Sequence, residues 1–343
     1  MVSFALKGAV IDYAQLEGRA RFLAREKLPL RLELHTFGPR DLYDPAGREK
    51  CLANLNRLQQ TFGRAELTVH IPFQDVNLVT RAAFDHDQVA VTLEFADRCG
   101  AKKIVMHRYW GMVYGDAPAR SNRVEAAEGF NAAVRSLARQ APGITLLVEN
   151  MGFYFLASRK RGDYLAGPID HFFPWEVAAF RADMAANAIA NVEPFIDVAH
   201  ATLSCNLFNR LKADVSDLDT DPRFTGITQD DLDRANRLHP FDFLDASMPW
   251  LHISDSHLLA APFPQDLPQV SLTSEGLELG TGNLPFQSLP EQLANGSAPT
   301  TLLLEVDPGK GDNYADNYAQ CRSLKYLRQC FDAEMTDASA GRN

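Results

Sequence analysis

Residues 144–150 read Ile-Thr-Leu-Leu-Val-Glu-Asn, a short and largely apolar run that follows Pro142-Gly143 and ends in a carboxylate. Apolar side chains at consecutive positions are typical of a parallel strand that is buried on both faces. Seven further runs of this kind lie on either side of it along the chain. The eight predicted strands are Phe4–Val10, Pro29–His35, Glu66–Ile71, Lys102–His107, Ile144–Glu149, Pro194–Val198, Pro249–Ser254 and Thr300–Val306.

Segments with helical periodicity separate these strands. The clearest spans Asn122–Gln140, where apolar residues such as Phe130 and Val134 recur at three- and four-residue spacing. Two others span Gln88–Cys99 and Asp316–Phe331. Strand–helix alternation repeated eight times predicts a fold of the α/β class, a single (β/α)8 TIM barrel.

An open, doubly wound sheet is the alternative arrangement of such elements. Sheets of that kind usually carry a glycine-rich phosphate-binding turn after the first strand, and the sequence near Val10–Asp12 has none. We therefore expect one TIM-barrel domain over residues 1–343, with its core at about residues 4–331.

Two predicted connections are unusually long. Residues 150–175 are rich in aromatic side chains, and residues 206–247 are mixed and acidic. Both follow the carboxyl ends of strands, so they are expected to form long loops at the C-terminal face, either as lids or as an interface in a homo-oligomer. The small, polar tail Ala333–Asn343 is expected to be frayed.

Composition limits the classes of partner. The net charge is −10, and the basic run Arg159-Lys160-Arg161 is short, which argues against binding to nucleic acid. The chain shows no signal peptide and no run of ~18 apolar residues that could cross a membrane. Five scattered cysteines without a Cys-x-x-Cys pair are typical of reduced thiols, and we expect a cytoplasmic protein with a small-molecule substrate.

Six consecutive predicted strands end in an ionisable residue. Burying one such group alone is costly, and six of them call for a common cause. In a barrel these ends meet at one rim, and imidazole and carboxylate groups together suit Zn²⁺, Mn²⁺, Co²⁺ or Mg²⁺. A divalent-metal site is the preferred interpretation, and a hydrogen-bonded network is the alternative. The residues are His70, His107, Glu149, Asp197, His252 and Glu305.

Short motifs between about residues 30 and 306 follow one another in a characteristic order. They are Leu32-Glu33-Leu34, Val69-His70-Ile71-Pro72-Phe73 with Asn77-Leu78, Val105-Met106-His107, Leu147-Val148-Glu149-Asn150, Asp197-Val198-Ala199-His200, Leu251-His252-Ile253-Ser254-Asp255, Leu279-Gly280-Thr281-Gly282-Asn283-Leu284 and Leu304-Glu305-Val306. Together they resemble the xylose isomerase-like TIM-barrel superfamily, which includes sugar epimerases and endonuclease IV.

The resemblance implies one metal ion held by Glu149, Asp197, His252 and Glu305. It also implies that the two glutamates act as acid and base, and that His200 contacts a substrate hydroxyl or carbonyl. The activity implied is that of a sugar or keto-polyol isomerase or epimerase. The glycines of the Gly280–Asn283 turn are expected to be structural.

The chemistry of such an enzyme requires these residue types. A metal ion stabilises the charge that develops when a proton leaves the carbon next to a carbonyl, one carboxylate removes that proton, and a second group returns one. Glu149 and Glu305 could flank the planar enediolate. Trp110, Phe73 and Phe153 could cover the apolar faces of the sugar, or they could simply pack on the rim of the barrel.

Two other functions compete with this interpretation. An endonuclease IV-like zinc phosphodiesterase would hold a second ion at His70, His107 and Glu149. Its third site would need His200 and an Asp-x-His pair before the glycine turn. That pair is absent there, although Asp255-Ser256-His257 occurs nearer to His252. A non-catalytic ligand-binding barrel is the other competitor.

Four further histidines are therefore predicted either to bind a second metal ion or to contact the substrate. They are His70, His107, His200 and His257. One histidine with three carboxylates favours Mn²⁺, Mg²⁺ or Co²⁺, whereas recruitment of His70 and His107 would favour Zn²⁺.

Overall fold

The computed structural model describes residues 2–72, 86–107, 121–150, 152, 173–215, 218, 227–245, 248–263, 275–294, 299–308 and 317–340. The described strands are β1 (Val2–Ala9), β2 (Arg31–His35), β3 (Glu66–His70), β4 (Lys103–His107), β5 (Thr145–Glu149), β6 (Val192–Asp197), β7 (Trp250–Ile253) and β8 (Thr300–Leu304). Each strand overlaps one of the eight strands predicted from the sequence, and the ends differ by at most two residues.

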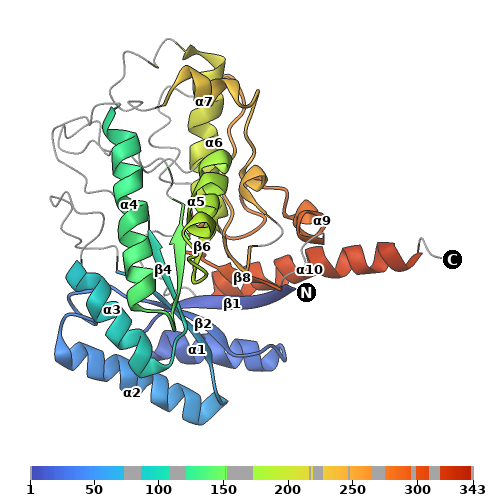
Figure 1. Cartoon of the computed structure of the whole chain (residues 1–343). Coiled ribbons are helices and arrows are strands. Elements are labelled where there is room, and N and C mark those ends of the chain that lie inside the picture. Colours follow the sequence, from blue (N-terminus) through green and yellow to red (C-terminus); the bar gives the residue numbers. More distant parts are fainter. Residues whose placement is uncertain are drawn as a thin grey trace.

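These strands form a closed parallel barrel in the order β1 to β8, and β8 pairs with β1 to complete it. Helices lie outside the strands, as Figure 1 shows. The predicted (β/α)8 barrel is thus confirmed. The described helices are α1 (Tyr13–Arg25), α2 (Pro45–Phe62), α3 (His86–Cys99), α4 (Ser121–Gln140), α5 (Pro174–Ala186), α6 (Val198–Ala213), α7 (Gln229–Asp233), η5 (Pro240–Phe243), η6 (Phe286–Ser288), α9 (Leu289–Ala294) and α10 (Asn317–Ala340).

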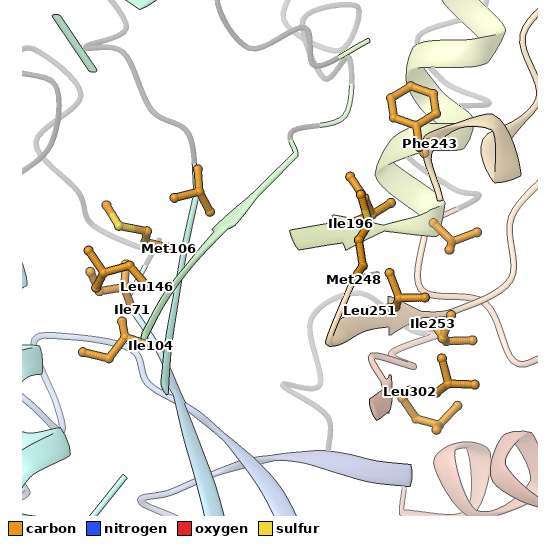
Figure 2. Packing of buried hydrophobic residues seen from close by; sticks show 14 of the residues in the cluster. Ile71, Ile104, Met106, Leu146, Ile196, Phe243, Met248, Leu251, Ile253 and Leu302 are labelled. Atoms are coloured by element: carbon orange, nitrogen blue, oxygen red, sulfur yellow. The ribbon is translucent and has the colours of Figure 1, made fainter. Parts of the chain in front are cut away.

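The main hydrophobic core lies between the barrel and its helices. Successive side chains of a strand point to opposite faces, so every second strand residue faces outward. Figure 2 shows such residues, among them Ile104 and Met106 of β4 and Leu251 and Ile253 of β7. Helix α4 adds Phe130 and other buried residues of its predicted apolar face to the same core.

A second, smaller core fills the inside of the barrel. Its six residues come from six different strands and are buried. Because they alternate with the outward residues, they form a packed layer across the barrel interior. We call this layer the lower tier; it consists of Ala5, Val105, Leu147, Phe195, Trp250 and Leu303.

An ionisable residue stands two positions after each member of the lower tier. A step of two residues returns to the same face of a strand, so these groups also point inward, nearer the carboxyl ends of the strands. We call them the upper tier; they are Lys7, His107, Glu149, Asp197, His252 and Glu305. The upper tier rests on an apolar floor, which lowers the polarity around it.

One described feature, the length of α10, differs from the sequence-based expectation. Helix α10 continues to Ala340, well past the predicted end at Phe331, so the backbone of most of the tail is helical rather than frayed. Residues 333–340 contain the good helix formers Ala, Glu and Met, and no glycine or proline interrupts them before Gly341. No described helix is both long and apolar enough to cross a membrane.

The long connections are described only in part. The predicted insertion 206–247 contains the end of α6 together with α7 and η5. Most of the aromatic insertion 150–175 lies outside the described residues. The three aromatic residues that the sequence proposes as a cover for the substrate, Phe73, Trp110 and Phe153, also lie outside them.

Candidate metal centre

The four residues of the predicted metal site meet at the carboxyl end of the barrel. Glu149 ends β5, Asp197 ends β6, His252 lies in β7, and Glu305 directly follows β8. One potential ligand atom from each of them lies within 4.8 Å of the others. Residues that are up to 156 positions apart in the chain therefore form one compact group (Glu149 to Glu305).

His252 lies at the centre of this group. Its Nδ1 atom is 2.9 Å from Glu149 Oε1, 2.6 Å from Glu305 Oε2 and 3.7 Å from Asp197 Oδ2. Burial alone would lower the pKa of the imidazole, but Glu305 and the neighbouring carboxylates hold that pKa well above its ordinary value. A positive charge is therefore favoured where these carboxylates meet.

Asp197 serves two elements at once. It ends β6 and also caps the N-terminus of α6, where its Oδ1 accepts the backbone N–H of His200 at 2.7 Å. Its other oxygen, Oδ2, faces His252. Asn150 fixes the backbone of Asp197 because its side-chain Oδ1 accepts the Asp197 N–H at 2.6 Å and its Nδ2 donates to the Asp197 carbonyl at 3.2 Å. The helix cap and this amide pair thus orient the carboxylate.

His70, His107 and Glu149 form a second group of potential ligands. The Nε2 atoms of His70 and His107 lie 3.3 Å and 3.1 Å from Glu149 Oε2. Burial lowers the pKa of His107, which favours the neutral imidazole that a metal ion needs. Glu149 belongs to both groups, with Oε1 towards the first and Oε2 towards the second.

A third group of potential ligands consists of Glu33, His70 and Glu305, and His200 lies beside these groups but in none of them. Its Nδ1 is 2.7 Å from the carbonyl of Asn150, and its Nε2 is 3.3 Å from Glu275 Oε1. Burial would lower the pKa of His200, but Asp197 and Glu275 raise it to about 10. A protonated His200 can donate to both neighbours, so the ring is held in a fixed orientation.

His257 is a second predicted site histidine that lies outside the groups of potential ligands. It is partly buried, and its backbone carbonyl accepts a hydrogen bond from Asn206. Its ring belongs to none of the ligand groups formed by the described residues.

Three described residues of the site were not predicted from the ends of the strands. Lys7 and Glu33 are fully buried, and Lys7 Nζ lies 3.0 Å from Glu33 Oε1 and 2.6 Å from Glu305 Oε1. Both lie within strands rather than at their ends. The alternation of inward- and outward-facing residues along β1 and β2 would have identified them as residues that point into the barrel. Glu275 lies in no strand, so no periodic signal marks it.

Asp255 explains the glycine turn. Its carboxylate accepts backbone N–H groups of Ser256, Gly280, Gly282 and Leu284 at 2.8–3.3 Å. A Cβ atom on Gly282 would collide with the Ser256 carbonyl and the Asp255 carboxylate. The predicted structural role of these glycines therefore fits the close approach of the turn to Asp255.

The donor set fits a divalent metal ion. The carboxylates of Glu33, Glu149 and Asp197, which are buried, and that of Glu305, which is partly exposed, lie around His252, and Lys7 forms ion pairs with Glu33 and Glu305. One imidazole with three carboxylates suits Mn²⁺, Mg²⁺ or Co²⁺, and the adjoining pair of histidines adds donors that suit Zn²⁺. A cation at this position would neutralise carboxylates that are otherwise close together in a poorly solvated interior.

Comparisons with known proteins agree with this architecture. No family model and no curated protein sequence matches the chain. Among solved structures, a D-tagatose 3-epimerase-like protein is 17% identical, with a TM-score of 0.52 over 98% of this chain and 99% of that one. The IOLI protein with a binding zinc atom is 13% identical, with a TM-score of 0.54 over 96% and 98% of the two chains.

A third similar structure is a xylose isomerase domain protein from Alicyclobacillus acidocaldarius. It is 15% identical, with a TM-score of 0.51 over 97% of this chain and 99% of that one. These proteins therefore share the TIM-barrel fold of this chain over nearly its whole length.

Proposed function

We propose that this chain is a divalent-metal-dependent isomerase or epimerase that acts on a small polyhydroxylated carbonyl compound such as a sugar. The observation that carries the proposal is the convergence of ligand atoms from Glu149, Asp197, His252 and Glu305 within 4.8 Å. The similar structures of an epimerase-like and a xylose isomerase domain protein support this reaction class.

The two glutamates differ in their access to a substrate. The side chain of Glu305 is 17% exposed, whereas that of Glu149 is fully buried. Glu305 would therefore remove the proton from the carbon next to the carbonyl, because a substrate at the rim reaches it first. Glu149, which is ionised in the free site, would first accept the proton of a substrate hydroxyl and would then give it to the carbon, on the other face in an epimerase or at the neighbouring carbon in an isomerase, while Glu305 would give the proton that it took to the hydroxyl oxygen.

The surrounding residues keep both carboxylates ionised and in place. Burial would raise the pKa of each, but His252 and His107 hold that of Glu149 well below its ordinary value, and His252 and Lys7 do the same for Glu305. A bound divalent ion would supply stabilisation of the negative charge on the substrate oxygens.

Exchange of substrate protons with D₂O tests the reaction class directly. Wild-type protein loaded with Mn²⁺ or Co²⁺ is incubated with a panel of ketoses, and deuterium incorporation at carbon is followed by NMR. Glu305→Gln and Glu149→Gln should each lose about 10²-fold or more of the exchange rate, the usual size of a general acid–base contribution. Glu66→Gln, an exposed glutamate in β3 that pairs with Arg31 and Lys103, should exchange like the wild type. Exchange that persists in both site variants contradicts the scheme.

A zinc phosphodiesterase is the second candidate, and the His70, His107 and Glu149 group favours it because Glu149 could bridge two ions. The net charge of −10 opposes a nucleic-acid substrate. Elemental analysis combined with an abasic oligonucleotide separates the two functions. More than one zinc ion per chain together with cleavage of the oligonucleotide would replace the isomerase proposal.

A further inference from the structure

Glu33 connects the metal-ligand group to the opposite side of the barrel. It lies in β2, is fully buried, and both of its carboxylate oxygens are 3.0 Å from His252 Nε2. The other ring nitrogen, Nδ1, faces Glu149 and Glu305. The two nitrogens of His252 therefore have different partners, namely Glu33 on one side and the ligand group on the other.

Lys7 holds Glu33 in turn. Its ammonium lies 3.0 Å from Glu33 Oε1, and its backbone is fixed on both sides. The Lys7 N–H donates to Gln320 Oε1 at 3.1 Å, and the Lys7 carbonyl accepts from the buried Arg19 guanidinium. These contacts to α10 and α1 fix the Lys7 backbone, and the buried ammonium is held by its ion pairs with Glu33 and Glu305.

We infer that Glu33 is a positioning residue for the metal centre, which holds the ring of His252 through Nε2 so that Nδ1 faces the ion. The inference rests on the proposed metal site. It uses a general property of histidine ligands, since a carboxylate on the second nitrogen sets the tautomer and the orientation of the ring and raises its basicity. Lys7 contributes as the counter-ion that keeps Glu33 in contact with His252.

The test measures metal affinity rather than catalysis. Metal-free protein is titrated with Co²⁺, and binding is followed by calorimetry and by the d–d absorption of the bound ion. Glu33→Gln should raise the Kd for Co²⁺ about 10–100-fold, the usual effect of removing such a partner, and should alter the absorption spectrum. Glu33→Asp retains the charge and should recover part of the affinity.

Glu66→Gln is the matched control, because Glu66 is also an ion-paired glutamate of the barrel but lies in β3 at the end opposite the site. The Kd of Glu66→Gln for Co²⁺ should stay within about twofold of the wild-type value, because an exposed ion pair far from the site contributes little. A Glu33→Gln protein that binds Co²⁺ as tightly as Glu66→Gln, with the same spectrum, overturns the inference. If wild-type protein itself binds no Co²⁺, the proposed function fails before this comparison is reached.

Discussion

The lower and upper tiers of the barrel interior share the same strands and the same inward direction, but they contain opposite chemistry. Leu147 and Phe195 fill the lower tier, and two positions further on Glu149 and Asp197 stand in the upper tier. The lower tier is stabilised by burial of apolar surface, whereas the upper tier is stabilised only where its charges are paired. On each of these strands, the residue that packs the barrel interior and the residue that belongs to the site are therefore only two positions apart.

Lys7→Met should give the largest change in stability. The substitution removes the ammonium from the buried carboxylate of Glu33 and from the partly exposed one of Glu305, and breaking a buried pair costs about 3–5 kcal/mol. Denaturant unfolding of metal-free protein measures this loss in the free energy of unfolding. Saturation with Mn²⁺ should recover part of the loss, because a divalent ion compensates Glu305. Lys103→Met, which removes a partly exposed lysine at the other end of the barrel, should cost at most about 1 kcal/mol.

Leu147→Ala changes the lower tier and should cost about 2–5 kcal/mol through lost burial and a cavity. This loss should be the same in metal-free and metal-saturated protein, because Leu147 contributes packing and no charge. Denaturant unfolding of the metal-free and of the Mn²⁺-saturated protein checks whether the two losses are equal. A metal-dependent loss for Leu147→Ala, or a metal-independent one for Lys7→Met, would break the distinction between the tiers.

Much of the scaffold could be predicted from the sequence, because the signals are local. Each strand is a short apolar run, and the ends of six such runs indicate where ionisable groups gather, while the choice of Glu149, Asp197, His252 and Glu305 among them comes from the family resemblance. Parallel strands in a closed barrel bring their carboxyl ends together, so separation along the chain does not matter.

The remaining members of the site were missed for physical reasons. Lys7 and Glu33 lie inside strands, where a polar residue between apolar ones reads as a solvent-facing position although it points into the barrel. Glu275 reaches His200 from a turn, where no periodicity marks its direction. The extension of α10 to Ala340 was missed because small residues suggest a tail, although alanine is the best helix former.

Titration of metal-free protein with Mn²⁺, Co²⁺ and Zn²⁺ tests whether Glu149, Asp197, His252 and Glu305 bind a cation, with binding followed by calorimetry and stability by thermal unfolding. Wild-type protein should bind at least one ion per chain and gain about 2.7 kcal/mol of stability at an ion concentration of 100 Kd. Asp197→Asn should bind more weakly while remaining folded, because asparagine also caps a helix such as α6. A folded wild-type protein without affinity for any of these ions would contradict the account.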